Sequence, residues 1–466
     1  MMFYGYNYYV HSLKLGTCFS LYMITSVIVF NYVYEAQPKP FIDEIFHVPQ
    51  AQKFCNGTFN EWDAKITTLP GVYLISVGAL KPLASFMDNV CSVYGLRLTN
   101  LVACLINFYL FYKLIKSINH IESVKNSSKA LLCGLNMACF PVLYFLSFLY
   151  YTDVISVFLI LLTMSLHYGK LYNTAAVTGF ISVGTRQTNI VWIFLIAIDG
   201  LIQYLNPYIM KTKLTQKVQS SSNYVKIFLM SIPEIKDKWL VFLGIFEQLG
   251  GYLLVGISFC VFLFLNGGIV VGDKENHSFT VHIPQIFYFS LFYLGFALPF
   301  CVTRIKPFLF LCKKQWKLII VFVASILIIV HFNTLVHPFL LADNRHYTFY
   351  VWKKLFENPI PFRYLISPVY IFGIYCINCN LAHLNFIHKC SFYVLLAFCL
   401  VPQKLVEVRY FVIPYLFLRL HLKDVRWWQL ICEFILYNVI NFITVYIFLT
   451  KTFYWSDSKD AQRIMW

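Results

Sequence analysis

The sequence predicts an all-α protein that crosses a membrane many times. Of its 466 residues, 59% are apolar or aromatic and only 12% are charged, whereas a soluble domain carries about 25% charged residues. The mean hydropathy is +0.66. The apolar residues form long runs, and a run of about 20 residues can cross a bilayer as a helix. We therefore expect one polytopic membrane domain over residues 1–466, with about 12–14 transmembrane helices.

The first apolar run, residues 13–34, is long enough to cross the bilayer, and no small-residue cleavage site follows it before Phe41. We interpret it as a retained signal anchor. The further predicted spans are 97–116, 130–151, 152–168, 171–184, 188–205, 239–265, 285–303, 317–337, 362–380, 389–401, 409–421 and 428–450. Several are short, so we expect some pairs, such as 171–205, to be broken or re-entrant helices that line a cavity.

The basic residues are shared unequally between the predicted loops. Most loop lysines and arginines fall in three loops: 113–129, 206–238 and 304–317. The positive-inside rule places these loops in the cytoplasm. The alternate loops then face the lumen: 35–96, 266–284 and 338–361. This alternation holds only if the apolar run 71–87 lies along the membrane surface. Lys353 and Lys354 break the rule, which suggests that their luminal loop uses positive charge.

The formal net charge of +16 raises the question of a nucleic-acid partner. Nucleic-acid binding needs a clustered, exposed basic patch. Here the lysines and arginines flank apolar runs, as membrane anchors do. We therefore expect a lipid bilayer and no nucleic acid as the partner.

The cysteines and glycosylation sequons give weaker signals. Most of the fourteen cysteines lie inside apolar runs and are expected to be packing residues. Cys55 and Cys91 both fall in the first luminal loop, where an oxidising compartment would allow them to pair. The sequons that begin at Asn56 and Asn276 also fall on the luminal side.

The first luminal loop holds the strongest candidates for chemistry. Helical spacing from Ile42 would place Asp43, Glu44 and His47 on one face, and the apolar residues Ile42, Ile45 and Phe46 on the lipid side. A turn that carries both acids, followed by a helix from Pro49, is the alternative. Ionisable groups beside a bilayer are usually functional, although two acids that only solvate a surface helix would give the same pattern.

Further along this loop, Trp62, Asp63 and Lys65 lie close together. A sugar stacks its apolar face on an indole while its hydroxyl groups bond to a carboxylate, so we expect a sugar site here. An interfacial belt tryptophan is the plainer explanation for Trp62.

Three other polar clusters interrupt apolar sequence: Asp343 with Arg345 and His346, Glu407 with Arg409, and Arg186 with its neighbours. Arg345 and His346 are suited to bind a phosphate through charge-assisted hydrogen bonds. Capping or snorkelling is the commoner role for each of these residues alone. We interpret Arg186, Asp343, Arg345, His346 and Arg409 together as substrate-binding candidates.

Six segments, taken in order, carry a family resemblance: DEIFHVPQAQKFC (43–55), WDAKITTLPGVY (62–73), RQTNIVW (186–192), LADNRHYTFYVWKK (341–354), VRYFVIPYLFLRL (408–420) and QRIMW (462–466). Over essentially its whole length, the chain resembles the dolichyl-phosphate-glucose-dependent alpha-1,2-glucosyltransferases. That family adds the last glucose to the lipid-linked oligosaccharide of asparagine-linked glycosylation. Ala64 and Leu69 depart from the family pattern, which has proline at both positions, and this puts the rigidity of the loop in question.

The resemblance implies the GT-C glycosyltransferase architecture in the endoplasmic reticulum membrane, with a luminal active site. It implies dolichyl phosphate glucose as donor and the doubly glucosylated oligosaccharide on dolichyl diphosphate as acceptor. The donor glucose is beta-linked and the product is alpha-linked, so the reaction inverts the anomeric carbon. An inverting transfer needs one general base on the acceptor hydroxyl. The closest rivals are a sister transferase for another dolichyl-phosphate sugar, a membrane transporter and a non-catalytic accessory protein.

On this basis each candidate receives a role. Asp43 is the expected base on the acceptor hydroxyl, with Glu44 as the alternative, and His47 orients the acid or contacts the acceptor. Arg345, His346 and Arg409 neutralise the departing phosphate. Trp62, Asp63 and Lys65 shape the sugar site. We expect no cofactor and no metal, because basic side chains suffice for the single charge of a phosphodiester and no dense carboxylate set for Mg²⁺ is evident.

Overall fold

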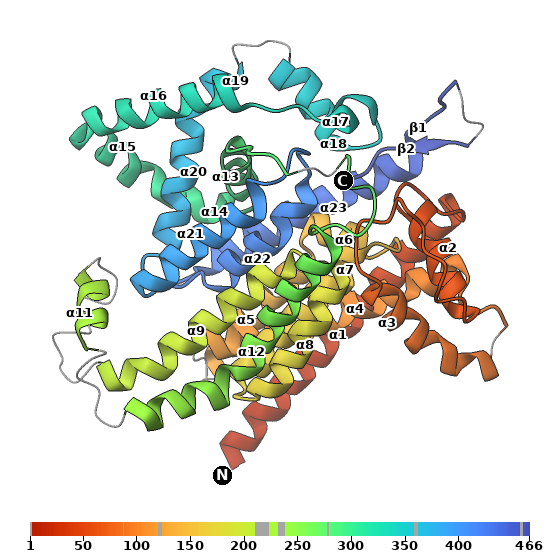
Figure 1. Cartoon of the computed structure of the whole chain (residues 1–466), viewed down its shortest axis with the longest axis horizontal. Helices are drawn as coiled ribbons and strands as arrows, with labels where there is room; N and C mark the ends of the chain where they lie inside the picture. The colour runs from red at the N-terminus through yellow and green to blue at the C-terminus, as the bar shows by residue number, and fades with distance from the viewer. Residues whose placement is uncertain are drawn as a thin grey trace.

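A computed structural model describes residues 2–86, 88–119, 124–209, 223–231, 238–276, 279–357, 362–456 and 460–466. Over these residues the chain is helical almost throughout (Figure 1). The sheet in this part of the chain is one antiparallel pair, β1 (Thr452–Phe453) with β2 (Gln462–Arg463). The predicted all-α polytopic fold is confirmed.

Seven helical segments of the described chain are long and apolar enough to cross a membrane. They are Ser12–Ala36 within α1 (Met2–Ala36), α4 (Val93–Ile118), Asn189–Tyr208 within α9 (Asn189–Ile209), α12 (Lys238–Asn266), α16 (Trp316–Asn333), α19 (Phe362–Leu365) with α20 (Ser367–Asn380), and α23 (Trp427–Thr450). An eighth would be α13 (Pro284–Phe296) joined to Leu298–Lys314, a pair bent by 89°. That bent pair contains α14 (Leu298–Cys301), η2 (Val302–Arg304) and α15 (Ile305–Lys314).

The other predicted spans form shorter helices. They are α5 (Val124–Ala138), α6 (Pro141–Leu146), α7 (Thr152–Tyr168), α8 (Tyr172–Thr185), α21 (Phe386–Leu400) and α22 (Val412–Leu420), which follows η4 (Val408–Phe411). Run 130–151 is divided because Pro141 opens a new helix, where its missing N–H and fixed φ fit best. Short spans of this kind are tolerated where protein packs around them.

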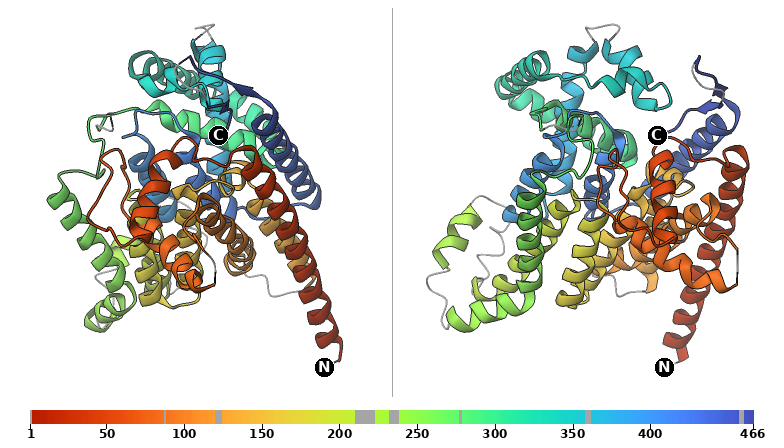
Figure 2. Two further views of the ribbon diagram at one scale, coloured as in Figure 1. Left: turned by 90° about the vertical axis from the view of Figure 1, so that its right-hand side faces the viewer. Right: turned by 45° about the vertical axis from the view of Figure 1, so that its right-hand side comes forward.

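The helices form two groups that meet at buried aromatic rings. Helices α4, α5, α7, α8 and α12 pack side by side, whereas α13 packs against α20, with α15 and α16 at the outer edge (Figures 1 and 2). At the meeting point Phe140 stacks on Tyr415, with 4.7 Å between ring centroids. A buried ion pair from Arg419 to Glu433, extended by Asn136, ties α22 to α23 and α5.

The first predicted luminal loop folds into α2 (Glu44–Cys55), α3 (Gly71–Leu80) and η1 (Lys81–Ser85). A disulfide joins Cys55 to Cys91, so the predicted pairing is confirmed. Run 71–87 gives no helix long enough to span within its described residues, and Leu74 and Leu83 are exposed.

The remaining helices lie in two other predicted loops. Much of the basic loop 206–238 lies outside the described residues, and α11 (Asn223–Ser231) is its described helix. The loop 338–361 contains α17 (Pro338–Ala342), α18 (Tyr347–Val351) and the π-helix η3 (Trp352–Glu357), and its residues 358–361 lie outside the description. The short helices α17 and α18 hold the candidate residues Arg345 and His346 between them.

Candidate active site

A cavity of about 420 Å³, here called the site cavity, lies between the start of α2, the segment 339–348 and the segment 405–409, with Trp455 beside them. Its lining includes Asp43, Asp343, Arg345, His346 and Arg409. Sequence analysis had placed these residues in three separate clusters. The fold therefore brings these three predicted clusters to one cavity.

Asp43 reaches this cavity because the chain turns sharply before α2. Ile42 has a positive φ of 53°, and Asp43 follows as the N-cap of the helix. An N-cap aspartate normally accepts a hydrogen bond from the first turn. Here it makes no such bond, and its Oδ2 instead accepts one from Arg409 Nη1 at 2.7 Å.

The electrostatic setting of Asp43 favours its ionised form. Burial alone would raise the pKa of the carboxyl, but the charges of Arg409, His47 and His346 and the Arg409 hydrogen bond outweigh it and lower the pKa to about 2. The side chain is 32% exposed. Asp43 is thus a carboxylate that faces the cavity and remains charged at neutral pH.

Arg409 is surrounded by carboxylates and an aromatic ring. Its Nε donates to Glu407 Oε1, its Nη1 lies 3.7 Å from Asp153 Oδ2, and its guanidinium lies over the Tyr151 ring. Asp153 also accepts from Arg186 Nη1. Arg186 lies outside the cavity lining, and it acts on the site through Asp153 and through its charge near His47.

Glu44, the alternative base, lies in a different environment. Its side chain is fully buried, and its two oxygens accept from Arg97 Nε at 2.8 Å and Arg97 Nη2 at 2.6 Å. The backbone N–H groups of Phe41 and Tyr150 also donate to it. Glu44 is absent from the cavity lining, so of the two neighbouring acids only Asp43 faces the cavity.

The apolar face predicted for this segment also differs from the structure. Ile42, Ile45 and Phe46 line the site cavity together with Asp43, although all three were expected to face lipid. Asp43 already has helical φ and ψ, so the helical period places it on the same side as Phe46, three residues further on.

Arg345 and His346 lie at the cavity wall, and Arg345 is already paired. Asp343 accepts from Arg345 Nε and Nη2, both at 2.8 Å, a two-pronged ion pair. The guanidinium also lies over Trp455, 4.5 Å from the ring centroid. His346 Nε2 lies 3.7 Å from Asp343 Oδ2.

The predicted sugar-site residues lie beside the cavity, outside its lining. Trp62 packs in a cluster with Phe54 and Tyr73, and Asp63 Oδ1 accepts from the backbone N–H of Lys65. Lys65 is the one of the three that approaches the cavity, because its Nζ lies 5.4 Å from the ring centre of Phe46.

His47 points away from Arg409 toward α3. Its Nδ1 is 2.6 Å from the Tyr73 hydroxyl. Burial, together with the charges of Arg409 and Arg186, lowers the pKa of His47 against the opposing effect of Asp43 and Asp153. The lowered pKa favours the neutral form of His47, which is suited to its hydrogen bond with Tyr73.

Two charged residues of this region, Arg97 and Asp153, were missed in the sequence. Both stand at the first or second position of a predicted apolar span, 97–116 and 152–168. Ionisable groups at such positions are commonly paired or functional, so their place inside otherwise apolar runs was the signal.

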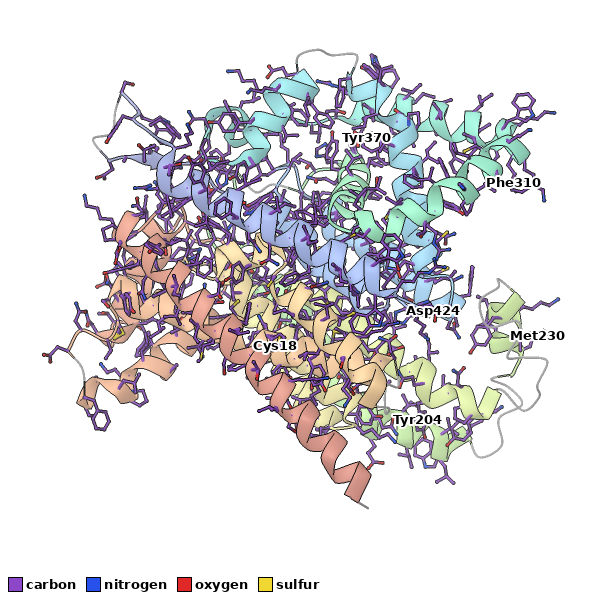
Figure 3. All side chains as sticks on the ribbon, turned by 180° about the vertical axis from the view of Figure 1, so that it is seen from behind. Cys18, Tyr204, Met230, Phe310, Tyr370 and Asp424 are labelled. Atoms are coloured by element: carbon purple, nitrogen blue, oxygen red, sulfur yellow. A yellow bond between two sulfur atoms is a disulfide. The ribbon has the colours of Figure 1, made fainter. Side chains whose placement is uncertain are left out.

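A second cavity of about 420 Å³ lies at the far end of α22 from Arg409. Its charged lining is mostly basic: Arg304, Lys423 and Arg426 with the single acid Asp424. Asp424 is at the opposite end of α23 from the β1–β2 pair (Figure 3). The site cavity is the better candidate for transfer chemistry, because there several carboxylates face guanidinium groups.

Comparison with known proteins identifies the family of the chain. The family model of the DIE2/ALG10 family matches residues 37–420, most of the chain. This chain belongs to the DIE2/ALG10 family. The matched range contains Asp43, Arg345 and Arg409, so the site cavity is built mainly from family-matched sequence.

Curated relatives of this DIE2/ALG10 protein span nearly its full length. A Homo sapiens protein named Dol-P-Glc:Glc(2)Man(9)GlcNAc(2)-PP-Dol alpha-1,2-glucosyltransferase is 39% identical over 471 residues, which covers 97% of this chain and 99% of the human one. A Drosophila melanogaster protein of the same name is 37% identical, covering 91% of this chain and 93% of its own. One from Arabidopsis thaliana is 32% identical, covering 97% and 99%.

Proposed function

We propose that this protein transfers glucose from dolichyl phosphate glucose to the terminal glucose of Glc2Man9GlcNAc2 diphosphodolichol, forming an alpha-1,2 linkage. Full-length similarity to transferases of that name supports the substrates. The observation that carries the chemistry is the ion pair between Asp43 and Arg409 at the cavity wall. It puts one carboxylate base and one phosphate-binding cation next to each other.

In the proposed reaction Asp43 removes the proton from the acceptor 2-hydroxyl as that oxygen bonds to C1 of the donor glucose. The bond from C1 to the phosphate oxygen breaks on the opposite face, and its electron pair leaves with dolichyl phosphate. One displacement inverts the beta donor to an alpha product. Arg409 stabilises the charge that develops on the phosphate.

The low pKa of Asp43, about 2, makes it a weak base in the empty site. A phosphodiester placed at Arg409 would share that guanidinium and add a negative charge near Asp43. Both effects raise the pKa of a carboxyl. Binding of the donor therefore strengthens the base, so that Asp43 becomes basic only when there is a glucose to transfer.

The charges of the cavity wall affect how a phosphate can be bound there. Three carboxylates line it (Asp43, Asp343 and Glu407), against two guanidinium groups (Arg345 and Arg409). A bound phosphate adds one more negative charge, so another positive group helps to hold it. Lys65, near Phe46 at the cavity edge, supplies it. Metal independence remains a prediction, and a chelator in the assay tests it.

We further propose that the protein resides in the endoplasmic reticulum membrane with the site cavity toward the lumen. The disulfide between Cys55 and Cys91 lies in the loop that carries Asp43, and disulfides persist in oxidising compartments. The sequon at Asn56 is exposed in the same loop. The lysine-rich segment 304–317, most of which forms α15, begins at Arg304 in the second cavity, at the opposite end of α22 from Arg409.

The test is transfer by the purified protein, with chelator present, from dolichyl phosphate glucose to the doubly glucosylated acceptor. Asp43→Asn should lower kcat by about 10²–10⁴. Glu61→Gln is the matched control, because Glu61 lies in the same loop but is exposed and outside the cavity lining. Near-normal transfer by Asp43→Asn would reject Asp43 as the base. A wild type that uses dolichyl phosphate mannose but not the glucose donor would reject the assigned sugar.

A further inference from the structure

The last five described residues, 462–466, return from the end of α23 and lie along the segment 345–347 of the site cavity (Figure 1). Met465 N donates to Arg345 O at 2.7 Å, and Tyr347 N donates to Met465 O at 3.0 Å. The two bonds lie on either side of His346 in the chain. His346 and Met465 thereby form a parallel β-bridge. We call residues 462–466 the C-terminal segment.

The C-terminal segment is itself firmly held. Arg463 donates to Phe448 O at 2.7 Å and to Ala36 O at 2.8 Å, which ties the segment to the ends of α23 and α1. Met465 is 0% exposed. The Trp466 ring packs on Tyr347, with 5.0 Å between ring centroids. The segment is therefore anchored to the helical body independently of the cavity.

The anchoring matters because Arg345 and His346 have no long helix of their own. They lie between α17 and α18, which are five residues each. Asn344 is held from the same C-terminal region, since Trp455 Nε1 donates to its Oδ1 at 2.9 Å. Arg345 Nη1 lies 3.4 Å from Gln462 Oε1. The last part of the chain thus fixes three successive residues, 344–346.

One contact has a direct chemical consequence. His346 Nδ1 lies 2.8 Å from the main-chain oxygen of Trp466. A main-chain oxygen only accepts hydrogen bonds, so Nδ1 must carry the proton. The other nitrogen, Nε2, faces Asp343 Oδ2 at 3.7 Å, and it must carry a proton of its own to donate to a phosphate in the cavity.

We propose that the C-terminal segment is a positioning element of the transferase site, in which the Trp466 main-chain oxygen holds Nδ1 of His346 and so orients the ring with Nε2–H toward the donor phosphate. The inference rests on the proposed function. Residues of the segment touch His346 and Arg345, not the substrates. They therefore act on transfer only through those two side chains.

The test is a double-mutant cycle between His346 and Trp466. Removal of Trp466 takes away the acceptor for Nδ1, and His346→Ala takes away the ring. Each change alone should lower kcat/KM for the donor by about tenfold to hundredfold, the range for a hydrogen bond to a chargeable group. If the segment acts through His346, the two changes together should cost no more than His346→Ala alone.

Two further variants separate positioning from folding. Trp466→Phe keeps the main-chain oxygen and a ring on Tyr347, so it should restore most of the activity. Lys451→Ala changes an exposed residue at the end of α23 and is the control for the region. The loss should appear in the KM for dolichyl phosphate glucose, with the KM for the oligosaccharide acceptor unchanged.

Additive losses in the cycle, or an equal rise of KM for both substrates, would overturn the proposal and leave only a folding role. The same cycle is then repeated by measuring how much dolichyl phosphate raises the melting temperature of each protein. This measures binding without turnover. If the wild type transfers no glucose, the proposed function fails, and the binding cycle alone then decides whether Trp466 positions His346. Additive effects there would overturn the proposal as well.

Discussion

Asp43 and Arg409 lie 366 positions apart in the chain and meet in a 2.7 Å ion pair at the wall of the site cavity. Arg409 also contacts two other acids, Glu407, which is close in sequence, and Asp153, which is distant in sequence. The pair joins the first loop to the entry of α22. It therefore couples the position of the proposed base to that of the proposed phosphate ligand.

Substitution of Arg409 should change both rate and pH dependence. Arg409→Gln removes the charge that holds the pKa of Asp43 near 2, and burial then raises that pKa. The acidic limb of kcat/KM should move to higher pH, and kcat should fall by about 10²–10³ through the lost phosphate contact. Transfer assays over a pH series measure both effects.

Arg409→Lys is the matched control for this prediction. It keeps a positive charge but loses the planar fork that serves two carboxylates at once. Its acidic limb should stay close to that of the wild type while kcat falls less than in Arg409→Gln. Identical pH profiles for the wild type and Arg409→Gln would contradict the proposed coupling.

Glu44 should behave differently from Asp43 although the two are adjacent. Glu44→Gln leaves the Arg97 guanidinium buried without its partner, which typically costs about 3–5 kcal/mol of folding free energy. We expect a large fall in melting temperature, with near-normal kcat in the protein that remains folded. Asp43→Asn should show the reverse, a small change in melting temperature and a large loss of kcat.

The double variant Glu44→Leu with Arg97→Met tests whether the unpaired charge of Arg97 causes the loss of stability. Replacing a buried pair by apolar residues of similar volume is often neutral or stabilising. The double variant should therefore melt above Glu44→Gln. If it melts as low as the single variant, the four hydrogen bonds of Glu44, two of them from the backbone at Phe41 and Tyr150, matter more than the charge of Arg97.

Much of this architecture was accessible from the sequence because the bilayer restricts where charge can lie. Asp43, Arg345 and Arg409 stood out as ionisable groups beside apolar runs, and all three line the site cavity. Composition and run length predicted the helical membrane fold. These inferences need no knowledge of distant contacts.

Which residues pair with each other could not be predicted from the sequence, because the partners lie far apart in the chain. Sequence analysis could not separate Asp43 from Glu44, since the distinction depends on Arg97, 53 positions away from Glu44. It likewise could not foresee that Met465 would pair with Arg345 and Tyr347. The break of run 130–151 at Pro141 was visible as a local signal, but the apolar character of the run outweighed it.

The disulfide should stabilise the loop that carries Asp43. Cys55 and Cys91 close a loop with a sequence separation of 36, and a crosslink of that kind contributes about 2–4 kcal/mol. Replacing both by serine should lower the melting temperature and reduce transfer by destabilising α2. Cys432→Ser is the control, because Cys432 is exposed and unpaired. Equal melting of the double variant with and without reductant, alongside a reductant-sensitive wild type, identifies the disulfide as the cause.

Gly71 should be essential for the contact between α3 and α8. A Cβ at this position would lie 2.4 Å from the carbonyl oxygen of Gly184, so Gly71→Ala must push the two helices apart. Gly184 lies two residues before Arg186, which pairs with Asp153. The displacement should thus reach Arg409 through Asp153, and we expect lower melting temperature and lower kcat together.

Gly78→Ala is the control within the same helix. A Cβ at Gly78 meets nothing within 4 Å, and alanine favours the helix by up to about 1 kcal/mol over glycine. This variant should melt at or above the wild type and keep its kcat. A Gly71→Ala protein that melts like Gly78→Ala would show that α3 can shift without cost, and that the position of Arg186 does not depend on the contact at Gly184.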